Sequence, residues 1–260
     1  MKKLRSLRVR ALAIVLINCL AMPISEQAQN LAPKYPDGKD FSRRNVAEDT
    51  ISFDGNEYLN WMSFNHSIFG SQAFFRGSQF DGWADFDSAY FPGSAVLDSL
   101  HFKEVALFVG VKADSNVFLN HSVFSKVAYF NDDSFRNQTQ FTGDSFYDWS
   151  DFGHSRFDGT SFFNFIWAGQ QVYFKSDTFR KQTNFTYTVF GGWVDFSSSQ
   201  FKDISFLDSL HFSRDVFFNE TTFDSNCTFS NTRFDRTVSF YKTRFGPAAA
   251  FDEIKVGDSY

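Results

Sequence analysis

Large apolar residues recur along this chain with a spacing that fits neither a regular helix nor a regular strand. In the stretch FTGDSFYDWSDFGHSRFDGTSFF (141–163), phenylalanine returns after five, six, five and six residues. An amphipathic helix repeats about every 3.6 residues and a half-buried strand every two, so neither produces this pattern. The spacing instead indicates an internal repeat of eleven residues with two apolar positions.

Two series of positions, each with a step of eleven residues, contain most of the phenylalanines. One series runs from Phe53 to Phe251 and the other from Tyr58 to Val256, and together they hold 31 of the 38 phenylalanines without an insertion. Two positions before each ring, the first series has small or β-branched residues and the second has mostly Ser, Thr or Asp. Residues two apart in an extended segment point to the same side, so we expect both to face inward. The predicted core ladder includes Phe64, Phe69, Phe75, Phe80, Phe86, Phe130, Phe135, Phe141, Phe146, Phe152, Phe157 and Phe163.

The residue three positions before each first-series ring indicates how many residues form one coil. From position 61, every twenty-second residue is mostly apolar, whereas the alternate column that begins at Gln72 is mostly polar. A coil of eleven residues would mix these two columns, so the sequence predicts about nine coils of twenty-two residues, each with four sides. The apolar column contains four tryptophans: Trp61, Trp83, Trp149 and Trp193.

The repeat units resemble those of the pentapeptide-repeat family, in an eleven-residue variant that alternates units of five and six residues. FNHSIF (64–69), FTGDSF (141–146) and ADFDSAYF (84–91) carry the resemblance, which extends over residues 53–256. The chain departs from the commonest family pattern because it has Phe rather than Leu at the centre and one extra residue in alternate units. The resemblance implies an all-β fold, a right-handed quadrilateral β-helix with the central side chain and the one two positions earlier facing inward.

The N-terminal residues predict export. Five basic residues precede an apolar run from Ala11 to Ala21, which is typical of a signal peptide and too short for a membrane-spanning helix. We therefore predict a signal peptide at 1–21, a linker or N-terminal cap at 22–50, and the β-helix at 51–260. The mature protein is expected in the periplasm or outside the cell, without a stable membrane span. An uncleaved anchor, a buried helix and lipid attachment at Cys19 are the alternatives.

Charge and cysteine content narrow the classes of partner. Removal of the five basic residues changes the formal charge from −5 to −10, with 20 basic and 30 acidic residues left. An acidic protein is poorly suited to nucleic acid, so we expect no nucleic-acid partner. Cys227 is then the single cysteine, which excludes an internal disulfide. Because the open end of a solenoid needs a cover, pairing of two copies through such an end is one expected arrangement.

No group of residues has the spacing of a catalytic or metal site. His66 and His154 share a column but lie four coils apart, or roughly 19 Å. Asp85, Asp151 and Asp195 also share a column and are two or three coils apart, too far for paired acid–base chemistry. A phosphate-binding Gly-rich loop and a nucleophile elbow are absent from the sequence. We therefore predict no enzyme activity and no cofactor or metal.

The tryptophan column is the candidate binding surface. Indoles in a row would stack on sugars or contact a protein, and the alternative is that they fill a corner and cover the core. We expect a non-enzymatic exported scaffold that binds a protein or glycan through a flat face. The alternative comes from the resemblance: some pentapeptide-repeat proteins mimic DNA and protect type II topoisomerases from quinolones. Export and the interspersed Lys and Arg disfavour it, and ice binding ranks last because the regular Thr positions face inward.

Overall fold

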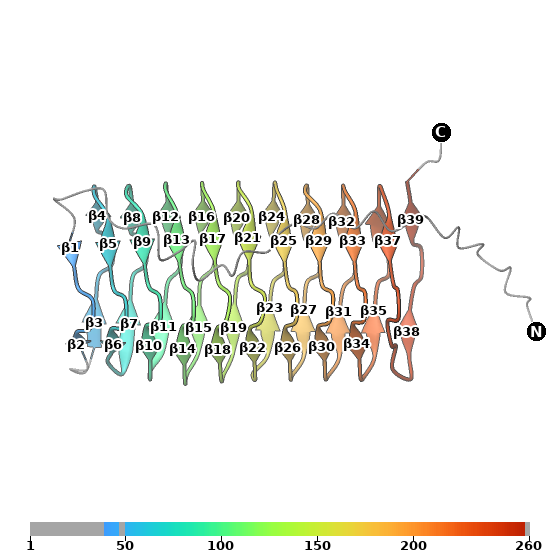
Figure 1. Ribbon diagram of the computed structural model, residues 1–260, viewed down its shortest axis with the longest axis horizontal. Helices are drawn as coiled ribbons and strands as arrows, with labels where there is room; N and C mark the ends of the chain where they lie inside the picture. Colours follow the sequence, from blue (N-terminus) through green and yellow to red (C-terminus); the bar gives the residue numbers. More distant parts are fainter. Residues whose placement is uncertain (1–38, 47–49, 258–260) are drawn as a thin grey trace, which may run out of the picture. The chain divides into compact units, whose positions relative to one another are not determined.

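The strands of this protein stack in four parallel sheets. The computed structural model describes residues 39–46 and 50–257, and in these ranges every element is a short strand and none is a helix. From β1 to β37, successive strands along the chain belong to sheets A, B, C and D in turn, so the chain visits each sheet once per coil (Figure 1). In the last coil the strand of sheet B is reduced to a single bridge between Thr222 and Arg244. The described residues thus form an all-β solenoid of about ten turns. Since they contain no helix, no apolar helix of membrane-spanning length occurs in this part of the chain.

Sheets A and B follow each other along every coil. The strands of sheet A are β1 (Lys39–Asp40), β5 (Met62–Ser63), β9 (Ala84–Asp85), β13 (Ala106–Leu107), β17 (Ala128–Tyr129), β21 (Ser150–Asp151), β25 (Val172–Tyr173), β29 (Val194–Asp195), β33 (Val216–Phe217) and β37 (Val238–Ser239). The strands of sheet B are β2 (Asn45–Val46), β6 (Ile68–Phe69), β10 (Tyr90–Phe91), β14 (Lys112–Ala113), β18 (Ser134–Phe135), β22 (Arg156–Phe157), β26 (Thr178–Phe179), β30 (Gln200–Phe201) and β34 (Thr222–Phe223).

Sheets C and D complete the coil. The strands of sheet C are β3 (Thr50–Ser52), β7 (Gln72–Phe74), β11 (Ser94–Val96), β15 (Val117–Phe118), β19 (Thr139–Gln140), β23 (Ser161–Phe162), β27 (Thr183–Asn184), β31 (Ser205–Phe206), β35 (Cys227–Thr228) and β38 (Ala249–Ala250). The strands of sheet D are β4 (Glu57–Tyr58), β8 (Gln79–Phe80), β12 (His101–Phe102), β16 (Val123–Phe124), β20 (Ser145–Phe146), β24 (Trp167–Ala168), β28 (Val189–Phe190), β32 (His211–Phe212), β36 (Arg233–Phe234) and β39 (Lys255–Val256).

The pairing register confirms the predicted length of the coil. Met62 pairs with Ala84, and Ala84 with Ala106, so each strand contacts the strand that lies twenty-two positions further along the chain. The first coil differs, because Lys39 pairs with Met62 and Asn45 pairs with Ile68. In both pairs the partners are twenty-three positions apart, one more than in the later coils. That extra residue hides the first coil from the eleven-residue pattern, so the stacked strands begin at β1, inside the segment expected to be a linker or cap. The described residues form about ten coils, where about nine were expected.

Phenylalanine rings stack face to face inside the solenoid. Phe86 lies between Phe64 and Phe108, with ring centroids 4.9 and 4.8 Å apart and nearly parallel planes. Rings of adjacent sides meet edge to face, as Phe86 does with Phe75 at 5.5 Å and 79°. The spacing equals that between neighbouring parallel strands, about 4.8 Å, so rings of consecutive coils are in direct contact. All twelve rings of the predicted core ladder are buried.

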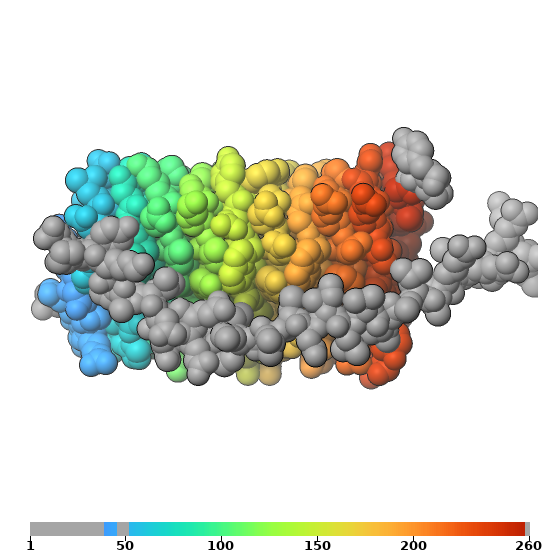
Figure 2. All heavy atoms as spheres, turned by 45° about the horizontal axis from the view of Figure 1, so that its top comes forward, coloured from blue at the N-terminus to red at the C-terminus, as the bar shows by residue number. Residues whose placement is uncertain are grey.

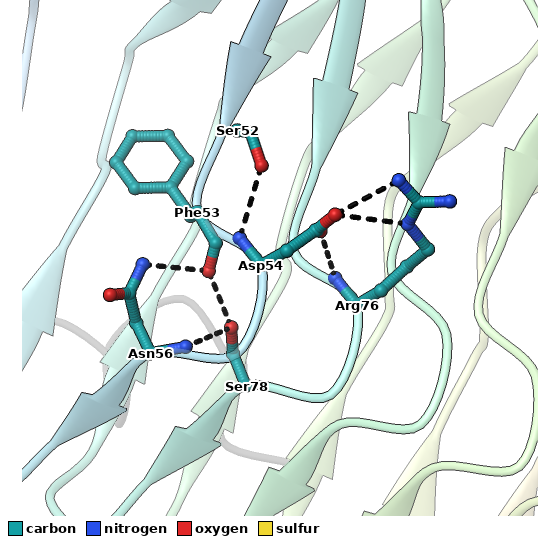
Figure 3. A network of polar contacts seen from close by, with 6 residues as sticks. All are labelled: Ser52, Phe53, Asp54, Asn56, Arg76 and Ser78. Atoms are coloured by element: carbon teal, nitrogen blue, oxygen red, sulfur yellow. Dashed lines mark hydrogen bonds and ion pairs between the residues drawn. The ribbon is translucent and has the colours of Figure 1, made fainter.

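Buried hydroxyls tie consecutive coils together at the positions before the second-series rings. The Ser78 hydroxyl donates to the carbonyl of Phe53 at 2.6 Å and accepts the N–H of Asn56 at 3.3 Å, both from the preceding coil (Figure 3). Beside them, Arg76 forms an ion pair with Asp54 at 2.9 Å. Hydroxyls in the same column of later coils donate to the preceding coil in the same way, as at Thr188 and Thr232. Serine and threonine recur at these positions because their hydroxyls satisfy buried backbone groups.

Half of the corners require a left-handed residue. Among the described residues, all twenty with φ between +54° and +75° stand two positions after Phe41 or after a first-series residue. These are the A–B and C–D corners, whereas no residue at the B–C and D–A corners has a positive φ in the described ranges. At several left-handed corners a carbonyl accepts the N–H three residues later, as between Phe64 and Ser67 at 3.0 Å. Only four of the twenty residues are glycine, so side chains of many kinds project from these corners.

Candidate binding surface

The four tryptophans of the candidate column lie outside sheet A, one residue before the strands β5, β9, β21 and β29. All four are partly buried. Trp61 and Trp83 stack on each other at 5.8 Å. They border a surface hollow of about 270 Å³ that Asp40, Arg43 and Asp85 also line. The structure therefore brings two of the four predicted side chains into direct contact.

Trp149 and Trp193 belong to a second aromatic group on the same side. The ring of Tyr173 lies between them, 6.1 Å from Trp149 and 4.9 Å from Trp193, in edge-to-face contacts. Tyr129 extends this row beyond Trp149, and Phe217 extends it beyond Trp193. Rings that contact each other in this way leave little of each face to a ligand. The column is thus a network of mutual contacts, with Trp61 and Trp83 separate from the rest.

The most exposed aromatic rings of the middle coils lie elsewhere, on sheet D and at its corner with sheet C. Phe165 and Tyr187 occupy this C–D corner in consecutive coils and stack at 5.3 Å with an angle of 9°. Their side chains are 55% and 60% exposed, whereas all four tryptophans of the column are partly buried. Both have the left-handed conformation, with φ of 58° and 59°. Bulky residues rarely adopt this conformation because it is strained.

Trp167 and Tyr147 form a second exposed pair beside the first, on the outside of sheet D. Their rings are 4.9 Å apart, and 42% of Trp167 and 56% of Tyr147 are exposed. The indole lies across Gly169, where a Cβ atom would come within 2.8 Å of the ring. Glycine at this position therefore lets the indole lie flat on the backbone. We call Tyr147, Phe165, Trp167 and Tyr187 the aromatic patch.

The outer surface of sheet C, next to the aromatic patch, carries no charge over four consecutive strands. Strands β15, β19, β23 and β27 expose amides, hydroxyls and phenylalanine rings in three columns: Asn116, Phe118, Asn120, Gln138, Gln140, Thr142, Thr160, Phe162, Asn164, Gln182, Asn184 and Thr186. Since 21% of the chain is charged, twelve neutral surface positions in a row are a distinct feature. Neighbouring coils are linked here, as by the hydrogen bond from Thr142 Oγ1 to Asn164 Oδ1 at 2.9 Å. We call these twelve residues the neutral face.

The comparisons with known proteins assign no family. No family model matches the chain, and no curated protein is similar to it in sequence. The solenoid with its regular phenylalanine repeat is compatible with a pentapeptide-repeat fold. The function has to be argued from the surface of this chain.

The titratable residues form no metal-binding group in the part of the chain that the structure describes. No three His, Cys, Asp or Glu side chains are arranged there to hold a metal ion. Three of the five histidines lie at exposed left-handed corners: His66, His121 and His154. His211 contacts Asp235 at 2.8 Å on the outside of sheet D. Burial raises the pKa of the Cys227 thiol to about 11, so this cysteine stays protonated at neutral pH.

The acids of the predicted column have a local structural contact. Asp85, Asp151 and Asp195 each accept the backbone N–H of the residue two positions later, at 2.8 to 2.9 Å. This is the hydrogen bond of an Asx turn, which stabilises the bend after the strand. The three side chains do not meet one another, because two or three coils separate them.

Sequence reasoning missed the aromatic patch, although one signal was present. Phe165 and Tyr187 are one coil apart and stand two positions after a first-series ring, where Gly55, Gly77 and Gly143 stand in other coils. Aromatic residues in a column that otherwise contains glycine, serine and other small or polar residues indicate exposed rings. The signal becomes readable only once that column is known to form a left-handed corner.

Proposed function

We propose that this chain is a non-enzymatic, exported scaffold that binds a glycan or protein partner on the outside of its stacked sheets. The single observation that carries the proposal is the aromatic patch, in which one stacked and one tilted pair of rings remain exposed. Exposed apolar area costs free energy in water, and the left-handed conformation of Phe165 and Tyr187 adds strain. Residues that lower stability without any role in the core are best explained by contact with a partner.

The pentapeptide-repeat family remains our proposal for the finer classification of the fold. The length of the coil, the four sheets and the inward positions two residues before each ring support it. Export is proposed from the N-terminal pattern alone, and residues 1–21 lie outside the described residues. Pairing of two copies through an open end likewise stays a proposal.

The distribution of charge favours a scaffold over a DNA mimic. A DNA mimic needs a surface row of unpaired carboxylates, whereas cations lie against the acids on the outside of sheet B. Asp158 contacts both Arg156 and Arg180, at 2.8 and 3.2 Å. Lys202 contacts Asp224 at 2.8 Å in the same way. These pairs give the surface an alternating sign that differs from the phosphate rows of DNA.

The test compares two double variants of the full-length chain. One variant is Trp61→Ala with Trp83→Ala, and the other is Phe165→Ser with Tyr187→Ser. Each protein is immobilised and exposed to a glycan array and to proteins released from the surface and periplasm of the host. Circular dichroism checks that each variant keeps the stacked sheets. We expect binding by the unchanged chain that the second variant loses.

Three results would contradict parts of this proposal. Loss of binding only in the tryptophan variant would move the site to sheet A. Binding to neither class of ligand would remove the scaffold function. A chain that fractionates with the cytosol and inhibits DNA supercoiling by a type II topoisomerase would favour the DNA-mimic alternative.

A further inference from the structure

We infer that the ligand of the aromatic patch is an uncharged, extended glycan chain that lies along the solenoid axis across the neutral face. This inference rests on the proposed binding function and specifies the chemical class of the ligand. Four observations carry it: the absence of charge, the exposed parallel rings, the spacing of outward phenylalanines and the unpaired amides.

The neutral face matches a ligand that has hydroxyls but no ionised groups. All of its side chains are amides, hydroxyls or phenyl rings, and within these three columns the nearest charges are Asp98 and Asp208 in the adjacent coils. The exposed Lys181 borders the face at the B–C corner, directly before Gln182. A charged ligand would meet no counter-charge over these four strands, so burying it would cost desolvation energy without compensation. Amides and hydroxyls both donate and accept, and they can therefore pair with sugar hydroxyls of any orientation.

The exposed ring pair supplies a stacking surface beside these polar groups. Phe165 and Tyr187 are nearly parallel and 5.3 Å apart, so they form one continuous edge along the axis of the coils. A pyranose ring has an apolar C–H face that packs on an aromatic ring while its hydroxyls point outward. Asn164 and Thr186 directly precede the two aromatic residues on the neutral face and can reach those hydroxyls. Aromatic side chains with neutral polar neighbours thus provide both kinds of contact that a sugar needs.

Outward phenylalanines on sheet C recur at every second coil. These rings are Phe74, Phe118, Phe162 and Phe206, and all four are partly exposed. Two coils correspond to roughly 10 Å along the axis, which is twice the strand spacing of about 4.8 Å. In an extended glycan whose successive sugars alternate in orientation, the same sugar face also returns at every second unit. A surface with this spacing suits a periodic polymer better than an irregular protein.

Two side-chain amides of the neutral face are free to form hydrogen bonds with a ligand. Within the described ranges, the side-chain amides of Gln138 and Gln182 have no hydrogen-bond partner in the protein, and they lie in one column on the same face. Asn120, in contrast, donates to Asp98 at 2.9 Å and to Gln140 at 3.2 Å, which holds that side chain in place. Free amides beside fixed ones allow sugar hydroxyls to replace water without breaking protein contacts.

The aromatic patch is specific to this half of the solenoid. The sequence repeats loosely after five coils, since FDGWADFDSAYF (80–91) matches FGGWVDFSSSQF (190–201). The residues five coils before Phe165, Trp167 and Tyr187 lack such rings, and they are Gly55, Glu57 and Gly77. The coil therefore forms without these rings. Their presence in one half only indicates a role in recognition and not in folding.

The experiment measures binding of the full-length chain to defined polysaccharides by native gel electrophoresis with polymer in the gel. The neutral probes are hydroxyethyl cellulose and galactomannan, and the acidic probe is alginate. Titration with chitohexaose provides a soluble neutral oligosaccharide. We expect retardation by at least one neutral probe and none by alginate, and at least a tenfold weaker affinity for Phe165→Ser with Tyr187→Ser.

The serine substitutions are chosen so that the fold is kept. Ser99 and Ser209 occupy the same corner column with φ of 58° and 55°, so serine is compatible with this backbone. The matched control is Tyr241→Ser, which removes a tyrosine that is 62% exposed at an A–B corner, away from the neutral face. Its affinity for the neutral probe should equal that of the unchanged chain.

The outcomes separate this inference from the proposed scaffold function. Binding to a neutral probe that the double variant loses and the control retains supports the inference. Equal loss in the control and the double variant, or no loss in either, overturns the assigned site. Retardation by alginate alone, or binding of a protein but of no glycan, overturns the ligand class and leaves the scaffold function standing. Absence of every ligand overturns both.

Discussion

Asp177 accepts the backbone N–H of Ser155 through Oδ1 at 2.8 Å, while its equally buried Oδ2 has no partner among the described residues. Asp133 and Asp144 have the same arrangement, each with one bonded and one unpaired oxygen. Asp133 and Asp177 stand in the column of Ser155, and Asp144 stands in the column of Ser122, and both serine hydroxyls donate to a carbonyl of the preceding coil. A protonated carboxyl can make the same donation, whereas a carboxylate cannot. The neutral acid is therefore the form that fits these two columns.

The stability of the folded chain should fall as the pH rises from 5 to 8. Burial raises the pKa of Asp133, Asp144 and Asp177 well above the ordinary value of 3.8, and neighbouring acids such as Asp132, Asp98 and Asp151 raise it further. The unfolded chain releases these protons above its lower pKa, while the folded chain keeps them. Each carboxyl thus lowers the free energy of unfolding by about 1.4 kcal/mol per pH unit until the folded pKa is reached. Urea unfolding followed by circular dichroism at several pH values measures this slope.

A triple variant provides the control for this pH dependence. Replacement of Asp133, Asp144 and Asp177 by serine restores the hydroxyl found at Ser155 and Ser122 and removes the three protons. The variant should be more stable than the unchanged chain at pH 8, and its slope should be less steep by up to about 4 kcal/mol per pH unit, the sum for three groups. Parallel pH profiles for the two proteins would show that these aspartates are ionised in the fold.

Adjacent phenylalanines should differ sharply in their contribution to stability. Phe163 is fully buried and stacks on Phe141 and Phe185 at 5.2 and 4.9 Å, whereas Phe162 faces outward. Phe163→Ala should lower the free energy of unfolding by about 3 to 5 kcal/mol, because it leaves a cavity between two rings. Phe162→Ala should cost about 1 kcal/mol, since water already reaches that side chain. Similar losses in chemical denaturation would contradict the inward and outward assignment.

The sequence alone predicts most of this fold because its strongest signal is periodic. The apolar positions from Phe64 onward repeat without an insertion, so the length of the coil and the inward positions follow directly. Phe41 stacks on Phe64 but stands one position earlier than the series requires, and one displaced ring cannot be recognised as part of a series. The first coil was therefore visible only in the strand pairing.

Replacement of Tyr187 by glycine should relieve backbone strain and stabilise the chain, and it should weaken ligand binding. Tyr187 has φ of 59°, a conformation that costs roughly 1 to 2 kcal/mol for residues other than glycine. Glycine avoids this cost but loses about 0.5 to 1 kcal/mol through the entropy of the unfolded chain. Tyr187→Gly should therefore raise the free energy of unfolding by up to about 1 kcal/mol, as measured by urea titration, and weaken ligand binding. A clear loss of stability would instead give this tyrosine a structural role.

The binding surface could not be read from the sequence in the same way. The tryptophan column was visible because its positions are mostly apolar while those of the alternate column are mostly polar, but burial depends on contacts with residues far along the chain. Tyr173 contacts both Trp149 and Trp193, and sequence spacing does not show such contacts between side chains. Conversely, Phe165 is a phenylalanine like those of the core, but its ring is exposed. The reason is that it stands at a left-handed corner and not at an inward position of a strand.

Replacement by alanine should lower the stability of the chain much more at Gly93 than at Gly77. At Gly93 a Cβ atom would lie 1.6 Å from the carbonyl oxygen of Ser71, so the two coils would have to separate. At Gly77 the same atom would meet nothing within 4 Å, and only the positive φ of 66° opposes it. Gly77→Ala should cost about 1 kcal/mol, and Gly93→Ala should cost several times more. Thermal unfolding of both variants tests the order, and equal midpoints would contradict it.

From Met62 onward each strand pairs with the strand twenty-two positions later, so such a protein can change in length by whole coils. Duplication or loss of one whole coil at any point returns the chain to the same phase, so every downstream ring meets an equivalent neighbour. A single extra residue is accommodated in the first coil, where Lys39 pairs with Met62 over twenty-three positions and Phe41 still stacks on Phe64. In Figure 2 the successive bands of colour correspond to these interchangeable layers. The number of recognition sites can therefore grow in whole layers, while their separation stays constant.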